Sequence, residues 1–238
     1  MRRRTTARVA GSLFLTATAS GVLSAVLLGP LDNWHSPESI AESAHRISAG
    51  ALMVLVMIGA IAMIPPTLFP VLKEHGEAPA LGYVVARIAE VVLLLPAAIG
   101  PLMMVAISDA GTPDNTAYLD TARILTQTYE LWGNPGSMLF FCLGALLLNY
   151  LLYRSRLVPR WIAGWALIAV VPYLADACLV MFGVLNPSSA VHTILFAPLA
   201  LNEMVLAGWL LTKGFRAPSP TLSAHVATTD SQAVGSSA

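Results

Sequence analysis

The sequence predicts an all-α fold, a polytopic bundle of six transmembrane helices with one further amphipathic helix on the outer surface. Hydrophobic residues make up 56% of the 238 residues and charged residues 11%, against about 45–50% and about 25% in soluble domains. The apolar residues form runs of about 20, enough to cross roughly 30 Å of hydrocarbon as a helix. The predicted spans are Val9 to Leu28, Ile47 to Ile64, Ala80 to Met104, Ser137 to Tyr153, Trp161 to Gly183 and Ala190 to Leu211.

The first span follows an arginine-rich start, a pattern that also describes a cleaved signal peptide. Its apolar stretch exceeds the about 7 to 15 residues of a signal core, and cleavage would leave five spans, so we interpret it as a span. Small residues recur at every fourth position and let another helix approach closely. This stripe fits packing within the bundle, and a homodimer is the alternative. The stripe consists of Ala17, Gly21, Ala25 and Gly29.

The distribution of Lys and Arg predicts the orientation, because positive loops are retained in the cytoplasm. With the N-terminus inside, only Arg46 and Arg123 lie outside, and Arg87 lies within a span. We therefore expect both termini in the cytoplasm and the chain in the inner or plasma membrane. The cytoplasmic basic residues are Arg2, Arg3, Arg4, Arg8, Lys73, Arg154, Arg156, Arg160, Lys213 and Arg216.

The segment between the third and fourth spans, residues 115–132, predicts the outer-surface helix. Tyr118, Leu125 and Tyr129 recur at helical spacing, and polar residues occupy the other faces. This pattern is typical of a helix that lies in the membrane interface.

The last residues predict a disordered cytoplasmic tail. Residues 217–238 are rich in Ser, Thr, Ala and Pro and contain few large apolar residues, so they cannot bury enough surface to fold. We therefore expect a transmembrane domain over residues 1–216, followed by this tail.

Ionisable residues inside the spans are the main indication of function. Each costs at least about 2.5–3.5 kcal/mol near the bilayer centre unless it is paired or hydrated. Arg87 and Glu90 are three residues apart in the third span and share one helix face. Asn202 and Glu203 lie at similar depth in the sixth span. The spacing predicts a buried polar cluster of these four residues near the midplane.

Two interpretations of the cluster remain open. In the first, Arg87 bridges both carboxylates and determines how the third and sixth spans dock. In the second, one Arg facing two carboxylates leaves either Glu90 or Glu203 with a proton, because a low dielectric disfavours an unpaired charge. An acid that can change its protonation suits a proton-coupled carrier or a general acid.

A second group of polar residues is expected on the outer side. Asp176 in the fifth span, with His45 and His192, forms a candidate aqueous vestibule. Glu38, Glu42 and His45 share one helix face, and with His192 they are a weak candidate for a metal site. Glu42 also fits an ordinary ion pair one turn further on. Because no tight metal motif is present, we predict no metal.

The two cysteines and the sequence motifs of known enzyme classes indicate no reaction. Cys142 and Cys178 lie at similar depth in the fourth and fifth spans and can face each other, although small buried thiols are the simpler interpretation. No nucleotide-binding, CxxC or serine-hydrolase motif occurs, so no cofactor is predicted. The formal charge is zero, which gives no indication of nucleic-acid binding.

Several segments resemble the bacterial membrane family DUF4386. The resemblance runs from about Arg8 to about Phe215 and is most specific from Arg154 to Trp161. It implies a six-span or similar helical membrane protein and brings no activity, so no catalytic residue is assigned. The segments are Phe69 to Lys73, Leu81 to Tyr83 with Arg87 and Glu90, Gly144 to Leu148, Tyr150 to Trp161, and Leu201 to Glu203.

The features together favour small-solute or proton-linked transport or binding around the Arg/Glu cluster. An intramembrane enzyme acting on a lipid or quinone is one alternative, and a non-catalytic scaffold or partner subunit is another. A water-filled path to the cluster would favour transport, a lateral opening the enzyme, and a dry, fully paired cluster the scaffold. The expected partners are the lipid bilayer and an unidentified small molecule.

Overall fold

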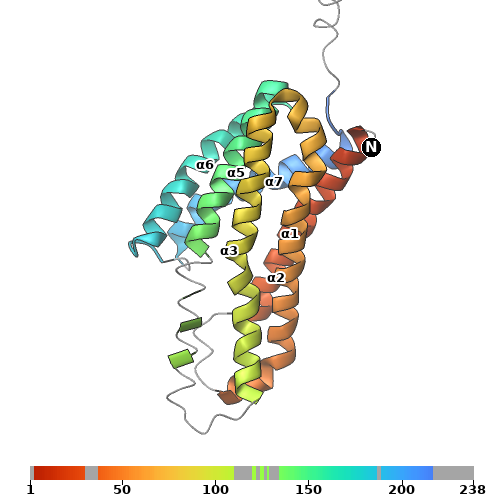
Figure 1. Ribbon diagram of the computed structural model, residues 1–238. Coiled ribbons are helices and arrows are strands. Elements are labelled where there is room, and N and C mark those ends of the chain that lie inside the picture. The colour runs from red at the N-terminus through yellow and green to blue at the C-terminus, as the bar shows by residue number, and fades with distance from the viewer. Residues whose placement is uncertain are drawn as a thin grey trace, which may run out of the picture.

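The computed structural model describes residues 3–29, 37–109, 120–121, 124–125, 128, 134–186 and 189–216, which contain helices and no strands. Six of the helices are long and apolar enough to cross a membrane, so the prediction of a six-span, multi-pass membrane protein is confirmed (Figure 1). The helices are α1 (Arg3–Leu28), α2 (Pro37–Leu72), α3 (Glu77–Asp109), α5 (Asn134–Ser155), α6 (Arg160–Met181) and α7 (Ala190–Thr212), with the short 3₁₀ helix η2 (Lys73–His75) between α2 and α3.

Helix α2 is much longer than the predicted span, because it begins at Pro37, before Ile47, and continues through Pro65, Pro66 and Pro70. Prolines are tolerated in membrane helices when other groups satisfy the backbone, and the Thr67 hydroxyl donates a hydrogen bond to the carbonyl of Met63 at 2.7 Å. The 36 residues of α2 and the 33 of α3 exceed the about 20 that cross a bilayer. Their lower ends extend beyond α5 and α6 in Figure 1.

The six helices form a closed ring in chain order. Each packs against the next, and α7 packs back against α1. Gly11 permits this closure, because a Cβ atom there would lie 2.9 Å from the carbonyl oxygen of Ala207. Any side chain at Gly11 would therefore push α1 and α7 apart.

The main apolar core lies at the end of the ring that carries η2, which we call the η2 end. All six helices contribute buried residues to it, including Phe14, Ile64, Tyr83, Leu151, Ile162 and Leu206. Towards the opposite end the core divides: one cluster joins α5, α6 and α7, and others join α2 to α3. The two halves of the ring are thus tightly packed only at the η2 end.

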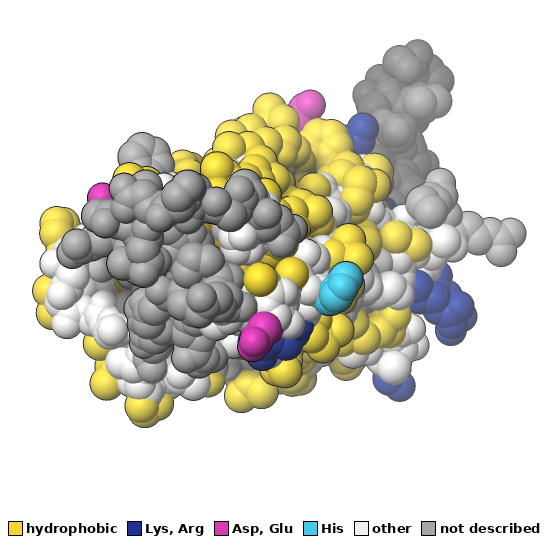
Figure 2. All heavy atoms as spheres, turned by 90° about the horizontal axis from the view of Figure 1, so that it is seen from below, with side chains coloured by type: hydrophobic (Ala, Val, Ile, Leu, Met, Phe, Trp, Pro, Cys, Tyr) yellow, Lys and Arg dark blue, Asp and Glu magenta, His cyan; other side chains and the backbone are white. Residues whose placement is uncertain are grey.

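The outward faces of the helices carry large apolar side chains. Ile168 is 75% exposed, Val26 69% and Ile194 69%, and hydrophobic side chains cover much of the described surface in Figure 2. In a soluble protein such a surface would signal association or aggregation. Around a ring of membrane-spanning helices it is the surface that contacts lipid.

Two predicted segments fall largely or wholly outside the described residues. The tail at 217–238 is not described at all, and only five residues of 115–132 are. These five are helical, and the Thr128 hydroxyl donates to the carbonyl of Ile124 at 2.8 Å. They do not establish an amphipathic helix on the outer surface.

Candidate functional site

Arg87 and Glu90 form a buried ion pair on α3. Arg87 Nη1 lies 3.0 Å from Glu90 Oε2, and the side chains are 5% and 4% exposed. The helix spacing that predicted a shared face therefore brings their charged groups into contact. Taken alone, this pair is electrically neutral.

Helix α5 provides the space that Arg87 occupies. A Cβ atom at Gly144 would lie 3.1 Å from Arg87 Cδ, so a glycine leaves room for the aliphatic stem. Arg87 Cζ lies 5.3 Å from the ring centroid of Phe141, within the range of a cation–π contact. Arg87 is thus held by Glu90 on its own helix and by the aromatic face of α5.

Glu203 of α7 stands apart from this pair. It interacts electrostatically with Arg87, yet among the described residues Glu203 has neither an ion-pair partner within 4.0 Å nor a hydrogen bond. Of the two interpretations, the one in which Arg87 bridges both acids finds no support in the described contacts, because the ion pair of Arg87 is with Glu90. Glu203 is partly exposed, and it lines a cavity of about 470 Å³.

Asn202 takes a different part from the one predicted. It is 1% exposed, and its Nδ2 donates a hydrogen bond of 2.8 Å to the backbone carbonyl of Ile162. This bond ties α7 to α6, and Asn202 also lines a small space together with Arg87 and Glu203. Asn202 is therefore a docking residue that also orients the helix carrying Glu203.

A small polar space lies on the η2 side of Glu203. Tyr83, Arg87, Asn149 and Glu203 are among the residues that line its volume of about 10 Å³, which is close to the minimum for one water molecule. Three buried polar atoms around it make no hydrogen bond to described residues: the Tyr83 hydroxyl, Arg87 Nε and Asn149 Oδ1. Asn149, a polar residue inside the fourth span, could have been singled out from the sequence.

The central cavity is much larger, about 470 Å³, and all six helices line it. Its charged lining residues are Arg87, Glu90 and Glu203. Its aromatic lining residues are Phe14, Phe141, Tyr173 and Phe196. Three residues of the small-residue stripe of α1, Ala17, Gly21 and Ala25, also line it, so the structure gives no support to a homodimer seam there. The lining residues are Phe14, Ala17, Thr18, Gly21, Val22, Ala25, Met57, Ile61, Arg87, Glu90, Leu94, Ser137, Met138, Phe141, Tyr173, Phe196, Ala200 and Glu203.

The aromatic residues of the cavity form a continuous series. Phe141 packs edge-on against Tyr173 with ring centroids 5.7 Å apart, and Tyr173 contacts Phe196 at 5.1 Å. Phe196 in turn stacks on His192 at 6.4 Å. The sequence does not predict this aromatic series, because nothing in an apolar span indicates the direction in which an aromatic side chain points.

Two of the three residues predicted for an outer vestibule meet. His192 Nδ1 lies 2.7 Å from Asp176 Oδ2, and the Asp176 side chain is fully buried. His45 is exposed on α2, which packs against α1 and α3, so His45 does not join them. Asp176 and His192 form a contact between α6 and α7 in which Asp176 is buried and His192 is partly exposed.

The weak metal candidate is not assembled in the part of the chain that is described. Glu42 and His45 are exposed on α2, and His192 contacts Asp176. The side chain of Glu38 lies outside the described residues. Among the side chains that are described, no three or more of His, Cys, Asp and Glu converge on one point.

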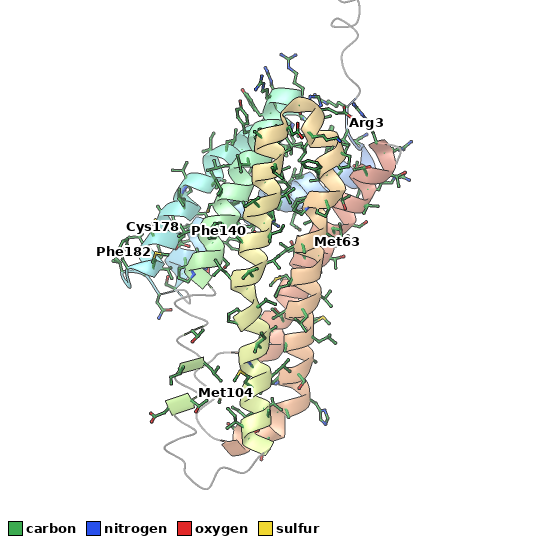
Figure 3. The ribbon with its side chains drawn as sticks, in the orientation of Figure 1. Arg3, Met63, Met104, Phe140, Cys178 and Phe182 are labelled. Atoms are coloured by element: carbon green, nitrogen blue, oxygen red, sulfur yellow. The ribbon has the colours of Figure 1, made fainter. Side chains whose placement is uncertain are left out.

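The two cysteines are both free. Cys142 is buried on α5, whereas Cys178 is exposed on α6, where Figure 3 labels it near Phe182, the residue that follows the helix. The expected burial is therefore correct for Cys142 and wrong for Cys178.

A family model described as "Domain of unknown function (DUF4386)" matches residues 9–214, which contain nearly all of the six helices. No curated protein and no solved structure matches the chain. Because the family description names no activity, the chemistry of the central cavity is the remaining basis for a functional assignment.

Proposed function

Because this chain belongs to the DUF4386 family, whose description states no activity, we propose its function from the central cavity. The protein binds a small solute in this cavity, and Glu203 releases a proton when the solute enters. The observation that carries this proposal is the contrast between the acids: Glu90 pairs with Arg87 at 3.0 Å, whereas Glu203 lines the cavity without a partner among the described residues.

The proton follows from the charge balance of the site. The titratable groups that face Glu203 are Tyr83, Arg87 and Glu90 of α3 and Tyr173 of α6. Arg87 and Glu90 cancel, and an unpaired carboxylate in a membrane interior carries a large desolvation cost. Glu203 therefore holds a proton in the empty cavity and releases it when a solute group takes its place. By linkage, protons and solute then weaken each other's binding.

The scaffold alternative fits these observations less well. A cluster that served only to dock α3 to α7 would be dry and fully paired, yet Glu203 borders a cavity of about 470 Å³. An enzyme acting on a lipid or quinone would use the same cavity and the same acid. Turnover of such a substrate by the purified protein would favour the enzyme over a binding or transport protein.

Labelling with dicyclohexylcarbodiimide tests the proposal without knowledge of the solute. This apolar reagent reacts with protonated carboxyl groups from within a membrane. We expect mass spectrometry of the native protein to find the adduct on Glu203, with a rate that falls as the pH rises. Glu90, held in the ion pair, is the matched control in the same molecule and should stay unmodified. Equal labelling of both acids, or none of Glu203, would contradict the proposal.

We also propose that both termini are cytoplasmic and that the protein lies in the inner or plasma membrane, because ten of the 13 Lys and Arg residues fall on one side of the spans. Reporter fusions at Lys73, Arg156 and Phe215 should read cytoplasmic, and fusions at Ser39 and Thr116 should read outside. An outside signal at Arg156 would reverse the arrangement.

A further inference from the structure

A second cavity, of about 330 Å³, borders the central one. Gly21, Ala25, Met57 and Leu94 line both, and the remaining lining comes from α1, α2, α3 and Leu125. Its one side-chain hydroxyl, on Ser24, donates to the carbonyl of Gly21 at 2.7 Å. The lining is mostly apolar and contains no charged side chain, so this cavity favours an apolar occupant.

The central cavity has the opposite character at Glu203. Phe14, Tyr173 and Phe196 line it together with this acid, and aromatic faces attract cations. An anionic group would have to compete with Glu90 for Arg87, which lies 3.0 Å from that acid and against the ring of Phe141. The combination of a free carboxyl group with aromatic faces selects a cation.

We propose that the solute is an organic monocation with a single hydrocarbon tail. Its charged head lies at Glu203 in the central cavity, and its tail extends into the second cavity between α1, α2 and α3. This inference rests on the proposed function, because it gives a chemical class to the solute that displaces the proton of Glu203. The exchange is electroneutral: one proton leaves the carboxyl group and one cation takes its place.

Two glycines allow the tail to be tested separately from the head. Gly100 is buried and lines the second cavity, and a Cβ atom there meets nothing within 4 Å. Gly100→Leu therefore places its Cβ atom in open space and adds apolar volume to the lining of the cavity. Gly59 on α2 is equally unobstructed but exposed, and it lines neither cavity. Gly59→Leu is the matched control for the cost of replacing a helix glycine.

The experiment uses the full chain in nanodiscs of zwitterionic lipid, with phenyltrimethylammonium as the short cation and decyltrimethylammonium as the long one. Because overpacking an occupied space costs roughly 1–3 kcal/mol, Gly100→Leu should weaken binding of the long cation about tenfold or more. Gly100→Leu should leave the affinity for the short cation unchanged. Gly59→Leu should change the affinity for neither cation. If Gly100→Leu does not fold, Ala97→Leu fills the same cavity.

The outcomes separate the two proposals. If the cavity-filling variant weakens the binding of neither cation, or weakens the binding of both equally, the tail does not occupy the second cavity. The proposed function still stands in that case if Glu203→Gln weakens the binding of both cations. If Glu203→Gln leaves both affinities unchanged, the head is misplaced and the proposed function fails with it. A wild-type protein that binds neither cation overturns the assignment of a cationic solute.

Discussion

Arg87→Leu is expected to lower the free energy of unfolding by about 3–5 kcal/mol, the cost of leaving one member of a buried ion pair uncompensated. The variant strands Glu90, which is 4% exposed and lies 3.0 Å from Arg87. It also removes the cation that lies 5.3 Å from the ring centroid of Phe141. Thermal unfolding in detergent measures the loss.

The control for this prediction is the double variant Arg87→Leu with Glu90→Gln. Removing both charges of a buried pair is often close to neutral, so the second substitution should recover most of the loss. Arg87 and Glu203 make no contact ion pair. The interaction energy measured by a double-mutant cycle should therefore be smaller for Arg87 and Glu203 than for Arg87 and Glu90. If this interaction energy stays below about 0.5 kcal/mol for both pairs, the level of independent sites, the ion pair between Arg87 and Glu90 is contradicted.

Glu203→Gln is expected to leave the fold intact and to remove the function. The amide replaces a neutral carboxyl group of similar shape, so the midpoint of thermal unfolding should change little. Binding of phenyltrimethylammonium should weaken about tenfold or more, because interactions with a charged partner contribute roughly 1.5–3 kcal/mol. Asn202, its neighbour on α7, is the structural control, because Asn202→Ala breaks the hydrogen bond to Ile162 and should reduce stability.

The pH dependence of binding should disappear in the same variant. In the wild type, protons compete with the cation for Glu203, so affinity should rise by about tenfold per pH unit while one proton is displaced. It should level off once Glu203 is ionised in the empty cavity. In Glu203→Gln the affinity for the cation should be the same at every pH. If the affinity of this variant changes with pH as steeply as that of the wild type, the displaced proton comes from another group.

The arrangement along each helix could be predicted from the sequence. Arg87 and Glu90 share a face because three residues separate them, and this spacing holds in any α-helix. The six apolar runs likewise define six spans, because the hydrocarbon thickness sets their length. The extension of α2 past Pro65 and Pro66 was missed, because a proline ends most soluble helices but not those in a membrane.

The arrangement between helices could not be predicted in the same way. Whether Glu203 reaches Arg87 depends on the tilt and rotation of α7, and these depend on contacts such as Gly11 against Ala207 and Asn202 against Ile162. No spacing within one helix encodes them. The central cavity exists because the ring is packed tightly at the η2 end and divides beyond it, a property of all six helices together.

The protons released when phenyltrimethylammonium binds can be counted by titration calorimetry in buffers of different ionisation enthalpy. We expect one proton per bound cation for the wild type, at a pH where Glu203 is protonated in the empty cavity, and none for Glu203→Gln. Binding without proton release at every pH between about 5 and 9, or equal release by both proteins, would contradict the assignment of Glu203 as the acid that exchanges its proton for the solute.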